Sequence, residues 1–130
     1  MADFTVKNLE DVEDSADGHG FGPALQARFA HDDLGCAQTG VSLQRLAPGA
    51  RMPFAHRHAQ AEEVYVVLSG SGRLLVDGEE VGLRRLDAVR LGPEPVRTLA
   101  AGPDGLEILA FGPRHEGDVE PAQAEWPSGP

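Results

Sequence analysis

Three side chains in the middle of the sequence have the types and the spacing of a metal-binding set. His56 and His58 lie two residues apart, and Glu63 follows closely. In a strand, alternate side chains point to the same face, so both imidazoles could reach one ion at about 2.0–2.1 Å. A carboxylate on a neighbouring strand would complete a two-histidine, one-carboxylate set with open coordination positions. Taken alone, however, the two histidines would also fit an exposed polar strand.

The expected strand that carries both histidines spans residues 51–58. Its alternation places Met52, Phe54, His56 and His58 on one face. Two apolar residues followed by two histidines describe a core face that opens into a polar mouth. Met52 and Phe54 are therefore candidates for a ligand pocket, although filling of the core is the simpler interpretation.

The next expected strand, residues 63–68, carries Glu63 and Tyr65 on one face and leaves Glu62 on the outer surface. The Tyr65 hydroxyl could orient a ligand or only satisfy a hydrogen bond in the core. Gln44 lies on the preceding strand, residues 41–46, and is a further candidate for the pocket.

Short strands separated by turns account for most of the remaining sequence. Residues 24–31 could form either a strand or a short helix. Asp77-Gly78 is typical of a tight hairpin turn. Further strands are expected at residues 73–76, 80–83, 88–91, 96–99 and 106–111. About eight short strands, with no room for helices between them, predict an all-β sandwich, barrel or jelly roll.

The composition fits one globular domain and argues against several classes of partner. The chain has 130 residues, a net charge of −10 and a single cysteine, Cys36, which can form no intrachain disulfide. An anionic surface repels phosphate backbones, so we expect no nucleic-acid partner. We expect no membrane span, because no apolar run approaches about 20 residues. The first residues do not resemble a signal peptide, which predicts a cytoplasmic protein.

The stretch from Gly49 to Gly70 closely resembles the first conserved motif of the cupin superfamily. Six residues separate Gly49 from His56-Arg57-His58, four precede Glu63, and six more precede Gly70. The resemblance covers roughly residues 40–112. It implies a double-stranded β-helix, or jelly-roll barrel, with a divalent metal held by His56, His58 and Glu63. It also implies a small-molecule cavity inside the barrel and is compatible with a homodimer, since many cupins are homodimers.

The second cupin motif departs from the family pattern at its histidine. Leu86-Asp87 stands at the family's Gly-Asp step, Pro93-Glu94-Pro95 forms the turn, and Arg97 occupies the position of the fourth ligand. Arginine stays protonated and cannot ligate a metal. If it faces inward, Arg97 could pair with Glu63 or clamp an anionic ligand. Alternatively, it could point outward from the barrel rim. The iron, manganese, nickel or zinc ion that the other ligands suit could therefore be absent.

The sequence thus predicts an acidic N-terminal segment (1–23), a cupin barrel (24–115) and a Pro-rich acidic tail (116–130). The acidic segment is expected to be solvated and the tail to be loose, except that Trp126 could dock on the barrel. The predicted function is binding of a divalent metal, of a small molecule that could be anionic, or of both. Alternatives are a metal-dependent dioxygenase or isomerase, and a metal-free binding module with Arg97 and Glu63 as its polar floor. No reaction is assigned, because Tyr65 and His31 are the only visible acid–base candidates beyond the ligands and neither is compelling.

Overall fold

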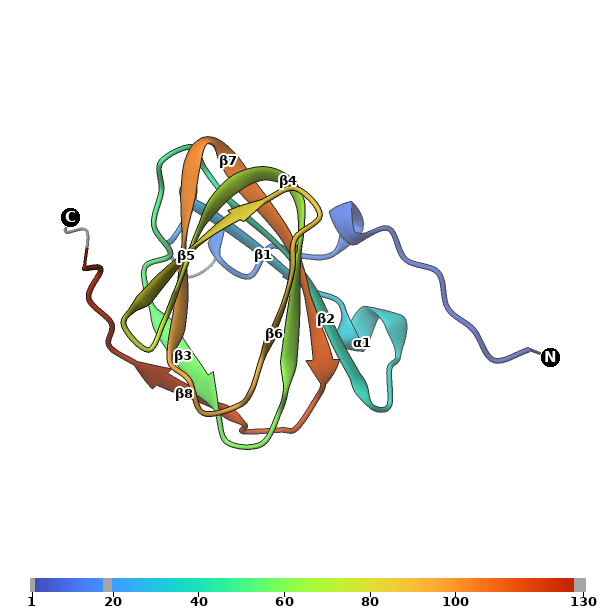
Figure 1. The fold of residues 1–130 in the computed structure, drawn as a ribbon. Coiled ribbons are helices and arrows are strands. Elements are labelled where there is room, and N and C mark those ends of the chain that lie inside the picture. The colour runs from blue at the N-terminus through green and yellow to red at the C-terminus, as the bar shows by residue number, and fades with distance from the viewer. Residues whose placement is uncertain (1, 18–19, 128–130) are drawn as a thin grey trace.

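The computed structural model describes residues 2–17 and 20–127. Eight strands form one sheet that curls into a barrel (Figure 1). They are β1 (Leu25–Phe29), β2 (Thr39–Leu46), β3 (Ala55–His58), β4 (Glu63–Val76), β5 (Glu79–Arg84), β6 (Ala88–Leu91), β7 (Arg97–Pro113) and β8 (Val119–Ala122). Two short helices, η1 (Leu9–Asp11) and α1 (His31–Leu34), accompany the sheet in the described part of the chain. The all-β, double-stranded β-helix prediction is confirmed.

Strand β7 holds the barrel together because it pairs with three other strands. It lies antiparallel to β2 and β4 along most of its length and to β3 at one residue pair, His56 with Arg97. Strand β4 pairs in addition with β5 and β6. The strand that begins with Glu63 is thus held beside the strand that begins with Arg97.

The sequence predicted separate strands at 63–68 and 73–76, and at 96–99 and 106–111, whereas the structure has one long bent strand in each case. Two register shifts in β4, between Val67 and Ser69 and between Gly70 and Gly72, bend the strand without ending it. Gly70 adopts a φ of 75°, and a Cβ at this position would overlap the Gly105 carbonyl of β7. The glycines therefore allow the two strands to cross closely, instead of marking a turn.

The other predicted elements agree with the structure more closely. Residues 41–46, 80–83 and 88–91 lie in β2, β5 and β6, and the hairpin at Asp77-Gly78 has φ angles of 45° and 82°. The ambiguous segment 24–31 forms β1 and then enters α1. Of the strand predicted at 51–58, only the end forms β3, because Pro53 has no N–H to donate and Arg51 makes only an isolated bridge to Ala100.

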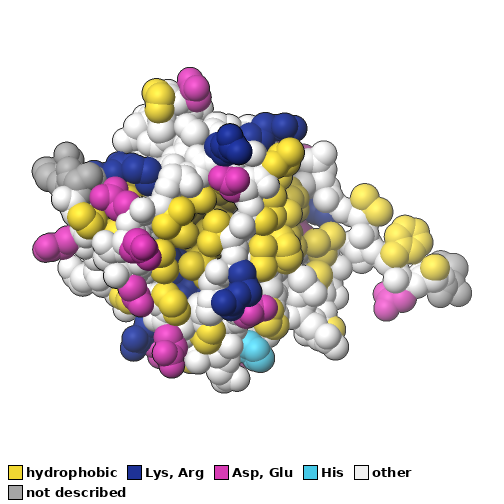
Figure 2. Space-filling model, viewed as in Figure 1, with side chains coloured by type: hydrophobic (Ala, Val, Ile, Leu, Met, Phe, Trp, Pro, Cys, Tyr) yellow, Lys and Arg dark blue, Asp and Glu magenta, His cyan; other side chains and the backbone are white. Residues whose placement is uncertain are grey.

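Aliphatic side chains fill the centre of the barrel. Those that are almost completely buried include Leu25, Val67, Leu74, Leu99 and Ile108. On the outside, apolar side chains gather near the middle of the face in Figure 2, and acidic and basic side chains are spread around them. Within the described residues, no helix is long and apolar enough to cross a membrane.

Both ends of the chain make more contacts than the sequence suggested. Val12 in the N-terminal segment is buried, and the Asp14 carboxylate accepts hydrogen bonds from the Ala16 and Ala27 amides at 3.0 and 2.9 Å. In the tail, which was expected to be loose, β8 pairs with β3 over four residue pairs. Trp126 docks as expected, with the Arg51 and Arg73 guanidinium carbons 5.1 and 4.9 Å from its ring centroid. The domain boundaries themselves stay a prediction.

Candidate metal centre and ligand cavity

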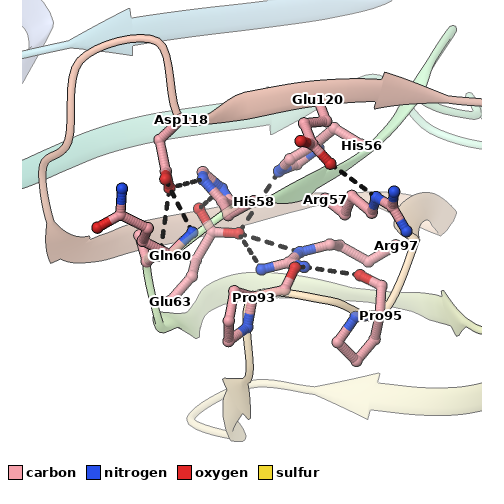
Figure 3. Close-up of polar contacts among 11 residues, drawn as sticks. His56, Arg57, His58, Gln60, Glu63, Pro93, Pro95, Arg97, Asp118 and Glu120 are labelled. Carbon is pink, nitrogen blue, oxygen red and sulfur yellow. Dashed lines mark hydrogen bonds and ion pairs between the residues drawn. The ribbon is translucent and has the colours of Figure 1, made fainter.

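The structure brings His56, His58 and Glu63 together at one point of the barrel (Figure 3). Both histidines come from β3, and Glu63 opens β4 after a short connection. The Nε2 atom of His56 lies 3.5 Å from Oε1 of Glu63, and the Nε2 atom of His58 lies 3.5 Å from Oε2. One potential ligand atom from each residue lies within 4.8 Å of the other two. The alternation of β3 thus directs both rings toward the carboxylate.

The charge of the Glu63 carboxylate and the buried His58 nitrogen that lacks a hydrogen-bond partner both suit the binding of a cation. Burial opposes ionisation of Glu63, but interactions with His56, His58 and Arg97 outweigh it and lower the pKa of this carboxyl. The Nε2 atom of His58 is buried and has no hydrogen-bond partner among the described residues, and the same holds for Nδ1 of His56. A divalent ion at this point would give the buried His58 nitrogen a partner and would meet a charged carboxylate. The donor set therefore fits a three-ligand metal site.

Arg97 points inward and is fully buried. Its Nε and Nη2 atoms both lie 3.3 Å from Oε1 of Glu63, while Nη1 donates to the Pro93 and Pro95 carbonyls at 3.0 and 2.7 Å. The predicted pairing with Glu63 is present, but it is not bidentate, because both nitrogens approach the same oxygen. Figure 3 shows the Glu63 carboxylate between the His58 ring and the Arg97 guanidinium. The second carboxylate oxygen is thus left facing His58.

A cavity of about 750 Å³ adjoins the three candidate ligands, all of which line it. Gln44, Met52 and Phe54 line it too. Arg97 and Tyr65, also predicted in the pocket, are buried and are not among the residues that line the cavity. The Phe54 ring lies 5.7 Å from that of Phe21. The cavity is therefore polar at the histidines and largely apolar elsewhere.

The acid–base candidates are placed differently from what the sequence suggested. Burial, and secondarily the Glu63 carboxylate, raises the pKa of Tyr65, so its hydroxyl keeps its proton. His31 lies on α1, where its Nδ1 is 3.0 Å from the Thr39 carbonyl oxygen, and it does not line the cavity. His115 does line the cavity, from the exposed segment after β7. His19 lies outside the described residues.

Asp118 is part of the site and was missed by the sequence analysis. Its Oδ2 atom lies 3.0 Å from Nδ1 of His58, and its carboxylate also accepts hydrogen bonds from the Gln60 and Ala61 amides at 2.8 and 3.0 Å. Burial opposes its ionisation, but the Ala61, Gln60 and His58 hydrogen bonds lower the pKa of Asp118. The residue lies in the predicted tail, directly before β8. Only the long-range pairing of β8 with β3 brings it to His58, so no local pattern could have revealed it.

Comparisons with known proteins give the same fold and family. A family model described as a cupin domain matches residues 42–102. A cupin protein from Bacteroides fragilis is 27% identical, with 95% of this chain and 93% of that chain covered and a TM-score of 0.70. A cupin-superfamily sugar phosphate isomerase from Silicibacter pomeroyi is 20% identical, with 96% and 89% covered and a TM-score of 0.71. A polyketide cyclase from Streptomyces resistomycificus is 16% identical, with 93% and 87% covered and a TM-score of 0.74. No curated protein matches the sequence.

The last two similarities indicate the fold alone, because their sequence identities are low. The family model spans His56, His58, Glu63 and Arg97 but ends before Asp118. The matched domain, the relative from Bacteroides fragilis and the double-stranded β-helix agree with one another. Residues 42–102 thus match a cupin domain, and the chain as a whole has the fold of the cupin protein from Bacteroides fragilis.

Proposed function

We propose that this cupin binds one divalent metal ion through His56, His58 and Glu63, and a small, largely apolar molecule in the adjoining cavity. The observation that carries the proposal is the convergence of these three side chains at the polar end of the cavity, with the buried Nε2 atom of His58 lacking a hydrogen-bond partner among the described residues. Iron, manganese, nickel and zinc all suit such a set, which leaves coordination positions for a ligand.

The cavity lining favours an apolar molecule over an anionic one. Four aromatic rings line it, those of Phe21, Phe29, Phe54 and Phe111. Arg114 is the sole lysine or arginine among the described lining residues, whereas Glu62, Glu63, Glu116 and Asp118 all line the cavity. Away from the metal site, a phosphate or carboxylate would thus meet mainly acidic side chains, and Arg97 does not line the cavity. We therefore favour an uncharged, flat apolar molecule with one polar group directed at the histidines.

A bound metal ion would also allow chemistry at this site. A metal ion at this site would supply Lewis acidity or activate oxygen. The protein would hold the apolar part of the substrate against the aromatic rings. An isomerase would also need a group that moves a proton, and His115, an exposed histidine that lines the cavity, is a candidate for that role.

Metal analysis tests the first half of the proposal. Protein purified without added metal and then titrated with zinc, manganese, nickel or ferrous ion should bind about one equivalent of at least one ion. His58→Ala should abolish this binding, whereas His31→Ala, which changes a histidine outside the cavity, should not. Less than about a tenth of an equivalent of every ion would reject the metal site.

Ligand titration tests the second half. Calorimetry should detect binding of 1-naphthol, an uncharged aromatic alcohol, but not of glucose 6-phosphate. Phe54→Asp places a charge against the ring of the ligand and should weaken naphthol binding, whereas Phe4→Asp, at an exposed position outside the cavity, should not. Tighter binding of the sugar phosphate would show that the apolar assignment is wrong.

One observation favours a second candidate, a metal-free binding module. The Arg97 guanidinium lies 3.3 Å from the Glu63 carboxylate and already balances its charge. In that case the protein would bind no divalent ion, and naphthol affinity would be the same with and without a chelator. A metal-dependent protein would instead lose naphthol affinity in the chelator, because the polar group of the ligand would lose its partner.

A further inference from the structure

The contact between Asp118 and His58 joins the C-terminal segment to the candidate metal centre. The distance from Oδ2 of Asp118 to Nδ1 of His58 is 3.0 Å, and the two side chains are 3% and 12% exposed. Asp118 lies directly before β8, and the residue pair Val119 with His58 is the first of the β3–β8 ladder. Backbone pairing and a side-chain contact thus hold the same histidine from the same segment.

We propose that Asp118 is a positioning residue that fixes the tautomer of His58, so that the Nε2 lone pair of this ring faces the metal site. The inference rests on the proposed metal-binding function. An ionised carboxylate can only accept hydrogen bonds, so the His58 nitrogen beside it must carry the proton. The other nitrogen, Nε2, is then unprotonated and lies 3.5 Å from Oε2 of Glu63, on the side where an ion would bind.

The remaining contacts of Asp118 keep its carboxylate in the accepting role. Its two oxygens accept hydrogen bonds from the Gln60 and Ala61 amides, which lie in the connection between β3 and β4. A protonated carboxyl, or an amide in its place, would direct a donor at one of these N–H groups. One side chain therefore orients His58 and also holds the connection that leads to Glu63.

The two histidines differ in this respect. The Nδ1 atom of His56 is buried and has no hydrogen-bond partner in the described part of the protein, so no neighbour holds a proton on that nitrogen, whereas its Nε2 atom lies 3.5 Å from Oε1 of Glu63. His58 is therefore the ligand prepared in advance, and His56 would adopt its ligating form when the ion binds. Carboxylates that hold the second nitrogen of a ligating histidine orient the ring and raise its basicity in other metal sites.

Two matched variants separate this role from a general loss of negative charge. Asp118→Asn keeps the shape of the side chain but turns one acceptor into a donor, which favours the His58 tautomer protonated at Nε2. Glu120→Gln is the control, because Glu120 lies two residues away and accepts from Nε of Arg57 at 2.9 Å, away from the site. Both changes remove one carboxylate that contacts β3.

The first measurement is nitrogen-15 NMR of the histidine rings in metal-free protein, at a pH about two units above the ordinary histidine pKa of about 6.5. Wild-type and Glu120→Gln protein should show His58 protonated at Nδ1, whereas His56, whose Nδ1 has no acceptor, should not show this preference. In Asp118→Asn the His58 proton should move to Nε2. The second measurement is zinc affinity, which should fall by about 10- to 100-fold in Asp118→Asn and stay unchanged in Glu120→Gln.

A wild-type His58 that carries its proton on Nε2 overturns the proposal, and so does an Asp118→Asn variant that binds zinc as tightly as the wild type. If Asp118→Asn fails to fold, the wild-type tautomer alone decides. Wild-type protein that binds no metal would reject the proposed function instead, and the tautomer, read without metal, would still show whether Asp118 orients His58.

Discussion

At the scale of single residues, Arg97 distinguishes this site from the four-ligand site that its family resemblance implies. The guanidinium is fully buried, and its acceptors are the Glu63 carboxylate and the Pro93 and Pro95 carbonyls. A buried charge that loses its partner destabilises a protein by several kcal/mol. In metal-free protein, Glu63 and Arg97 therefore depend on one another.

Removal of the Glu63 charge alone should reveal this dependence. We expect Glu63→Gln to lower the free energy of unfolding of metal-free protein by about 3 kcal/mol, because the buried Arg97 cation loses its counter-charge. The double variant with Arg97→Met should be more stable than the sum of the single effects predicts. Urea denaturation measures the free energy of unfolding of each variant.

The control is Glu62→Gln, at an exposed ion pair with Arg90, which should change the free energy of unfolding by less than about 1 kcal/mol. Additive effects of the two site variants would contradict the coupling.

Replacement of Arg97 should change metal affinity in the opposite direction. Arg97→His removes a cation that competes for Glu63 and adds an imidazole at the position of the fourth cupin ligand, so zinc affinity should rise by about tenfold or more. Arg97→Met relieves the competition without adding a ligand and should give a smaller gain. Calorimetric titration with zinc would compare the three proteins. Equal affinities would show that the buried guanidinium does not oppose metal binding.

At the scale of elements, the sequence was most informative where the geometry is local. Alternation along β3 was enough to place His56 and His58 on one face, and Asp77-Gly78 was enough to place the hairpin. The direction of Arg97 could not be predicted in this way, because it depends on the pairing of β7 with β3. The contact of Asp118 with His58 could not be predicted either, since the β3–β8 ladder that produces it joins residues about 60 positions apart in the sequence.

The bend of β4 can be tested at Gly70, which lies between the two separate strands predicted at residues 63–68 and 73–76. Gly70→Ala should destabilise the protein by about 3 kcal/mol, because φ is 75° and a Cβ would overlap the Gly105 carbonyl. Gly82→Ala in β5 is the matched control, since no atom lies within 4 Å of its added Cβ. Thermal unfolding of the two variants measures the difference. Equal midpoints would show that β4 and β7 do not need the close crossing.

At the scale of the whole molecule, the C-terminal segment returns to the barrel and contributes to the site. It supplies Asp118 beside His58, forms β8 beside β3, and places the Trp126 ring against Arg51 and Arg73. Figure 1 shows β8 alongside β3 before the chain leaves the barrel. Parts of the chain far apart in sequence therefore build one metal centre.

The docking of this segment can be followed directly, because Trp126 is the only tryptophan in the sequence. Arg51→Ala combined with Arg73→Ala removes both cations from its ring and should shift its fluorescence emission to longer wavelength, as the indole becomes more exposed to water. Arg85→Ala, at an exposed position, should leave the emission unchanged. An unshifted spectrum in the double variant would show that the cations do not hold the ring.

The place of β8 at the end of the strand order also bears on self-association. With β8 in place, the outermost strand has four residues, among them a charged Glu120 and a Pro121 that has no N–H to donate. These features discourage pairing with another chain. If this segment detached, β3 would expose its own unpaired amide and carbonyl groups, and a second molecule could add a strand there. The segment that supports His58 thus also covers the edge of β3, where another copy of the protein could otherwise add a strand.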